Sequence, residues 1–80
     1  MNKDLVMRAI ANEMEYLYTK VLTNPKNEGK DLSNWIGEVK ELYEAYFELR
    51  GHEGTIRFIQ GMDVEANNVK DIYKAVLDME

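Results

Sequence analysis

The stretch from Asp31 to Arg50 constrains the fold of this chain more than any other, because its residue types follow a helical period. When residues are placed about 100° apart around an axis, apolar side chains gather on one side and glutamates on the other. The apolar side holds Trp35, Val39, Leu42, Tyr43, Tyr46 and Leu49. The other side, called the acidic face below, holds Glu38, Glu41, Glu44 and Glu48. The stretch therefore predicts an amphipathic helix over residues 32–50.

A first helix is predicted over residues 3–23, with Asn2 as its N-cap, because apolar residues recur at spacings of three and four. Its buried stripe is expected to contain Val6, Ile10, Met14, Leu17 and Val21, widened on one flank by Met7, Ala11, Tyr18 and Leu22. A smaller apolar patch lies on another side and consists of Leu5, Ala9 and Tyr16. An apolar arc this broad predicts contact with two neighbouring helices, or with another chain.

Residues 24–30 separate the first two helices and contain Pro25, the only proline of the chain. A proline pushes the preceding residue out of the α region, and Gly29 tolerates a positive φ. A loop of this length can reverse the chain, so the second helix is expected to pack antiparallel to the first. Asp31 and Ser33 are both competent N-caps for the second helix, and Gly51 is a natural end for it.

A third helix is predicted over residues 64–79, with Asp63 as its cap. Its buried residues are expected to be Ala66, Val69, Ile72, Tyr73, Val76 and Leu77. The preceding residues 55–60 are β-branched and aromatic, but a single strand would have no partner. We therefore expect a short helical or extended segment there, ended by Gly61.

Three amphipathic helices with short connections predict an all-α fold, a compact antiparallel three-helix bundle. The chain has 80 residues, which is enough for one domain over residues 1–80 and too few for a second core. It has no cysteine, so disulfides are excluded. Because we see neither a signal peptide nor an apolar run long enough to cross a bilayer, we expect a cytoplasmic protein that does not enter a membrane.

The charge balance restricts the partners. Fifteen acidic and ten basic residues give a net charge of −5, which opposes binding to phosphate backbones. The third predicted helix offers only Lys70 and Lys74 as cations. Direct binding to nucleic acid is therefore not expected, and a DNA-binding transcriptional regulator of the helix-turn-helix type remains the alternative.

No pattern in the chain predicts catalysis, a cofactor or a bound metal. His52 is the sole histidine, and no second histidine or cysteine stands at ligand spacing from it. The carboxylates lack the Glu-x-x-His pattern of di-metal bundles, and no phosphate-binding or calcium-binding loop is present. We therefore expect a non-enzymatic protein. A small hydrolase or metal enzyme that uses His52 with nearby carboxylates is the enzymatic alternative.

The acidic face and its aromatic neighbours are the best candidates for a partner-binding surface. Charged helix faces are often merely solvated, and aromatic residues are often simply core, so both explanations stay open. The functional hypothesis is a protein–protein interaction module, such as an inhibitor or accessory factor of the kind that phages and mobile elements encode. It would bind a basic partner, and it could form a homodimer. The predicted partner-binding residues are Glu41, Glu44 and Glu48, with Tyr46 and Phe47 as apolar anchors.

Overall fold

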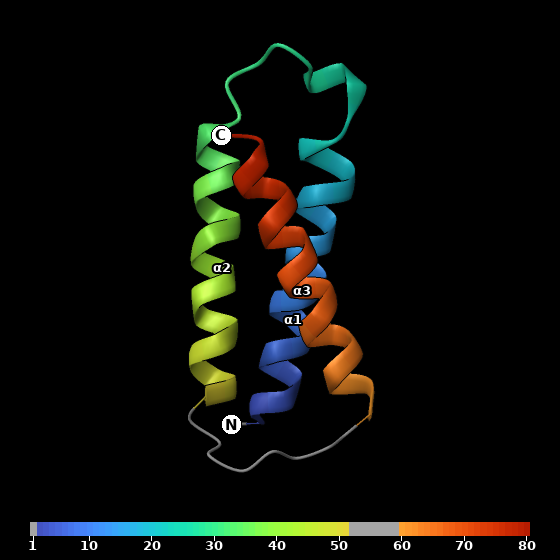
Figure 1. Ribbon diagram of the computed structural model, residues 1–80, viewed down its shortest axis with the longest axis vertical. Coiled ribbons are helices and arrows are strands. Elements are labelled where there is room, and N and C mark those ends of the chain that lie inside the picture. The colour runs from blue at the N-terminus through green and yellow to red at the C-terminus, as the bar shows by residue number, and fades with distance from the viewer. Residues whose placement is uncertain (1, 52–59) are drawn as a thin grey trace.

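The computed structural model describes the backbone of residues 2–51 and 60–80, and the side chains of residues 2–51 and 64–80. Three long helices lie side by side along a body of 43 × 22 × 19 Å, and α2 runs antiparallel to α1 and α3 (Figure 1). The predicted all-α three-helix bundle is therefore confirmed. The elements are α1 (Lys3–Tyr16), the π-helix η1 (Leu17–Leu22), the 3₁₀ helix η2 (Pro25–Asn27), α2 (Ser33–Gly51) and α3 (Gln60–Asp78).

The start of α1 is as predicted. The Asn2 side chain accepts hydrogen bonds from the backbone amides of Asp4 and Leu5, at 3.0 and 3.3 Å. These bonds satisfy two of the amides that a helix leaves unpaired in its first turn.

The buried side of α1 is rotated relative to the predicted stripe. Met14 and Leu17 are buried as expected, but Val6, Ile10 and Val21 are only partly buried. The other buried residues of this segment are Met7, Ala11 and Leu22, which were predicted only to flank the stripe. Because α1 packs against both α2 and α3, the residues at the centre of its whole apolar arc are the buried ones. The predicted stripe lies to one side of that centre.

The first helix does not continue as a regular α-helix to residue 23. Residues Leu17–Leu22 form a π-helix, in which hydrogen bonds span five residues. The backbone amide of Thr23 donates to the Tyr18 carbonyl at 3.0 Å, and the Thr23 hydroxyl donates to the same oxygen at 2.9 Å. The amide side chains of Asn24 and Asn27 donate to the carbonyls of Lys20 and Val21, at 3.2 and 2.9 Å. Side-chain donors thus satisfy carbonyls that the end of a helix leaves unpaired.

The loop between the first two helices behaves as its composition predicted. Pro25 opens η2, and Gly29 adopts a φ of 84°. The Ser33 amide, at the start of α2, donates a hydrogen bond of 3.0 Å to Asp31 Oδ1. Hydrogen bonds from the side chain and the backbone of Ser33 lower the pKa of the Asp31 carboxyl, so the charged form of Asp31 serves this turn.

The third helix begins earlier than predicted. Because α3 starts at Gln60, Asp63 lies inside the helix, and the prediction that Asp63 is its cap was wrong. Gly61 was expected to interrupt the chain, but a glycine costs a helix only about 1 kcal/mol, which packing easily outweighs. Of the segment predicted at residues 55–60, only Gln60 is described, as the first residue of α3; the rest lies outside the described residues.

The core lies along the axis of the bundle. The contribution of α3 matches the prediction at Ala66, Val69, Ile72 and Val76, whereas Tyr73 is only half-buried and Leu77 is 38% exposed. The contribution of α2 is Ile36, Val39 and Tyr46. The acidic face of α2 is consequently turned outward.

Candidate functional site

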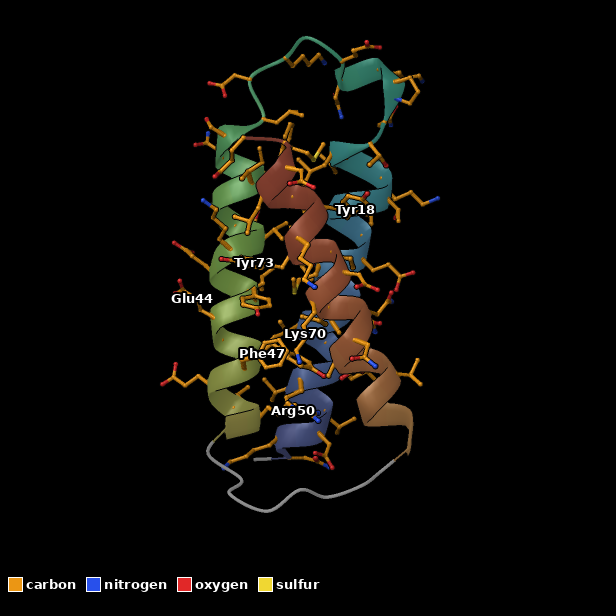
Figure 2. All side chains as sticks on the ribbon, viewed as in Figure 1. Tyr18, Glu44, Phe47, Arg50, Lys70 and Tyr73 are labelled. Atoms are coloured by element: carbon orange, nitrogen blue, oxygen red, sulfur yellow. The ribbon has the colours of Figure 1, made fainter. Side chains whose placement is uncertain are left out.

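The acidic face of α2 consists of side chains with the same charge. Its four glutamates, Glu38, Glu41, Glu44 and Glu48, are all exposed. Figure 2 shows Glu44 pointing away from α3, at the outer edge of the bundle. Among the described residues, Glu38, Glu41 and Glu44 take part in no ion pair. Their charges are therefore available to a partner.

Lys40 is the only cation within the span of the acidic face, and it is engaged elsewhere. Its Nζ forms an ion pair with Glu80 Oε1, beyond the end of α3. The hydrogen bond to Glu80 raises the pKa of the Lys40 ammonium, with a smaller contribution from the charge of Glu80. This pairing draws Lys40 towards the α3 side of α2, so it does not neutralise the glutamates.

An aromatic cluster lies between α2 and α3. The rings of Tyr43 and Tyr73 are stacked, with centroids 3.7 Å apart and an interplanar angle of 10°. Phe47 lies against Tyr43 and Tyr46, with centroid distances of 4.9 and 5.0 Å. Tyr43, Phe47 and Tyr73 are half-buried, so the outer edge of the cluster borders solvent.

Tyr46 belongs to the core and not to the exposed surface. Its side chain is 0% exposed, and its hydroxyl donates a hydrogen bond of 2.9 Å to Glu65 Oε1 on α3. Burial raises the pKa of this hydroxyl, as do the hydrogen bond to Glu65 and its negative charge, while the neighbouring Arg50 acts in the opposite direction. A side chain held in this way is not accessible to a partner, so the surface proposed below leaves out Tyr46.

Phe47 lies at the border between the core and solvent. Figure 2 shows its ring turned towards α3, where Lys70 Nζ lies 5.5 Å from the ring centroid. A cation over an aromatic face is attracted by the ring quadrupole. Phe47 and Glu44 therefore point in different directions from α2, and the structure does not gather them into one patch. Glu41, Glu44 and Glu48 do share a face.

His52 lies outside the described residues, so the structure does not test the hypothesis of an enzyme that uses His52. Over the part of the chain that the structure describes, no group of three His, Cys, Asp or Glu side chains could hold a metal ion. Within that same part, no helix combines the length and apolar character needed to cross a membrane.

Three contacts at the α2–α3 junction were not predicted from the sequence. These are the hydrogen bond between Tyr46 and Glu65, the Tyr43–Tyr73 stack and the position of Lys70 over Phe47. All of them join residues far apart in the chain, so periodicity within one helix carries no signal for them. Comparison of the chain with protein-family models, curated proteins and solved structures found no match.

Proposed function

We propose that this chain is a small non-enzymatic interaction module that binds a basic protein through the acidic face of α2. The observation that carries the proposal is the row of exposed glutamates at Glu38, Glu41 and Glu44, which no ion pair within the described residues neutralises. Complementary charge speeds encounter with a basic surface and disfavours acidic competitors. An inhibitor or accessory factor acting in the cytoplasm is the role this surface fits best.

The cost of the acidic face to the fold supports the proposal. Glutamates three or four residues apart on a helix repel one another, by a few tenths of a kcal/mol per pair. The proximity of Glu41 and Glu44 therefore does not stabilise the fold. The Phe47 ring is turned towards α3 and Lys70, so the proposed interface consists of the glutamates and does not include Phe47.

A double charge reversal tests the proposal. The wild-type chain and Glu41→Lys/Glu44→Lys are used to capture partners from a lysate of the source organism, and the recovered partner is then titrated by calorimetry. We expect affinity to fall by about tenfold or more, because two attractive contacts become repulsive. Affinity for the wild-type chain should also fall as salt is raised.

The matched control is Asp71→Lys/Asp78→Lys on the outer side of α3, where both aspartates are exposed. It changes the net charge by the same amount and moves the charge away from the acidic face. Equal losses in the two variants would indicate a net-charge effect, and unchanged binding by Glu41→Lys/Glu44→Lys would refute the proposal. The melting temperatures of both variants should stay close to that of the wild type, since none of the four residues is buried.

A further inference from the structure

A second surface lies on α1, where exposed residues have the spacing of a helix–helix packing line. Leu5, Ala9, Asn12 and Tyr16 follow one another at spacings of four, three and four on α1, and all four are exposed. Leu5 is 58% exposed and Tyr16 is 56% exposed, which makes them two of the most exposed large apolar side chains in the described residues. Alternating steps of three and four are the spacing by which two helices pack against each other along a line. We call these four residues the α1 seam.

We propose that the α1 seam pairs with the α1 seam of a second copy of this chain, with the two helices antiparallel. A two-fold axis midway between Ala9 and Asn12 brings Leu5 of each copy against Tyr16 of the other, and Ala9 against Asn12. Each large side chain then lies at an end of the interface, and small or polar side chains lie at its centre. The same patch meets itself, as in any two-fold dimer.

Charges beside the seam fit this arrangement. Arg8 and Glu15 stand on the same flank of α1, and both are exposed. Neither forms an ion pair with another described residue. In the antiparallel dimer, Arg8 of each copy faces Glu15 of the other, which gives two identical ion pairs. The net charge of −5 on each copy opposes association only weakly, because charges on distant faces are screened beyond about 8 Å at physiological salt.

The π-helix argues against the parallel orientation. A parallel dimer would place every seam residue against its own copy and Arg8 near Glu13 of the partner chain. A π-helix has more residues in each turn than an α-helix, so Lys20, four residues after Tyr16, continues the line of the seam. Two exposed Lys20 side chains would then meet head to head. The antiparallel orientation places them at opposite ends of the interface.

Sedimentation over a concentration series, up to about 1 mM protein, tests the dimer, and charge swaps test its geometry. Arg8→Glu and Glu15→Arg should each weaken dimerisation by about tenfold, because two attractive pairs become two repulsive ones. The double swap Arg8→Glu/Glu15→Arg should restore it. Since both residues are exposed, circular dichroism should report unchanged helix content in all three variants.

Three results would overturn the inference. The first is a monomer at every concentration, and the second is a dimer that neither single swap weakens, which would have to use another face. The third is rescue of Arg8→Glu by Glu13→Arg and not by Glu15→Arg, which would show a parallel pair. The inference does not depend on the proposed function, because Glu41→Lys/Glu44→Lys on α2 should dimerise like the wild type.

Discussion

The hydroxyl of Tyr46 on α2 donates a hydrogen bond of 2.9 Å to the Glu65 carboxylate on α3. Tyr46 is the largest of the fully buried side chains, and no buried side-chain polar atom among the described residues lacks a partner. A buried hydroxyl without a hydrogen bond would cost several times the net gain of an ordinary one. The bond therefore specifies which turn of α3 lies beside Tyr46, since the other buried residues in the described part of the chain are apolar.

The first prediction concerns the free energy of unfolding. Tyr46→Phe should lower it by about 1–2 kcal/mol, because the substitution removes a hydrogen bond to a charged group while keeping the ring. Urea denaturation followed by circular dichroism measures the change. Tyr18→Phe is the control, since the Tyr18 hydroxyl forms no hydrogen bond with the described residues, and it should change stability by much less. Equal losses of stability in the two variants would show that the hydrogen bond from Tyr46 to Glu65 makes no special contribution to the free energy of unfolding.

The raised pKa of the Tyr46 hydroxyl also predicts how stability depends on pH. Raising the pKa of a tyrosine in the folded state favours its neutral form. The resulting stabilisation is complete below the unfolded pKa, near 10, and is lost as the pH rises above that value. Between about pH 9 and pH 11, the wild type should therefore lose more stability than Tyr46→Phe. Thermal melts of both proteins over this range test the prediction, and parallel losses would contradict it.

The architecture could be predicted from the sequence because each helix carries its own period. The chain of apolar positions in α3 located Ala66, Val69, Ile72 and Val76 in the core, and all four are buried. The π-helix could not be predicted in this way, since Leu17–Leu22 keeps the composition of an ordinary helix. Its geometry is shown by backbone hydrogen bonds that span five residues, such as the one from Thr23 to Tyr18, and the side chains that satisfy carbonyls near its end belong to Asn24 and Asn27, outside the helix.

The candidate surface was predictable in part. The exposure of Glu41, Glu44 and Glu48 follows from their position opposite the apolar side of α2. Tyr46 and Phe47 were both expected to be surface anchors, yet Tyr46 is completely buried. The helical period already placed Tyr46, and not Phe47, on the apolar side of α2, but it could not show whether another helix supplies a partner for the buried hydroxyl. Glu65 supplies that partner.

Lys70 should stabilise the fold through Phe47. Its Nζ lies 5.5 Å from the ring centroid, within the range of a cation–π contact at a solvent-exposed site. Lys70→Met keeps most of the aliphatic stem and removes the charge, so we expect a loss of about 0.5–1 kcal/mol. Lys74→Met is the matched control one turn later, where no aromatic ring contact engages the lysine within the described residues. The difference between the two variants in urea denaturation should vanish in a Phe47→Leu background.

Two glycines should respond to alanine in opposite directions. Gly37 lies inside α2, and an added Cβ there would meet nothing within 4 Å, so Gly37→Ala should stabilise the protein by about 1 kcal/mol. Gly29 has a φ of 84°, so Gly29→Ala should destabilise it by about 1–2 kcal/mol despite the open space around it. Thermal melts compare the two variants. A loss of stability in Gly37→Ala would mean that the glycine serves a close approach that the single chain does not show.

The acidic face should cost the fold measurable stability. Glu44 stands three residues after Glu41 and four before Glu48, so its charge repels both glutamates. Lys40, four residues before Glu44, is held in the ion pair with Glu80. Glu44→Gln should raise the free energy of unfolding by about 0.5 kcal/mol at low salt, and the gain should shrink at about 1 M salt as the repulsion is screened. Asp71→Asn is the control, because Asp71 is exposed and forms no ion pair with another described residue, so removing its charge should change stability much less. Urea denaturation at the two salt concentrations measures both. A destabilised Glu44→Gln would mean that Glu44 supports the fold, and the cost of the acidic face would no longer count in favour of a binding role.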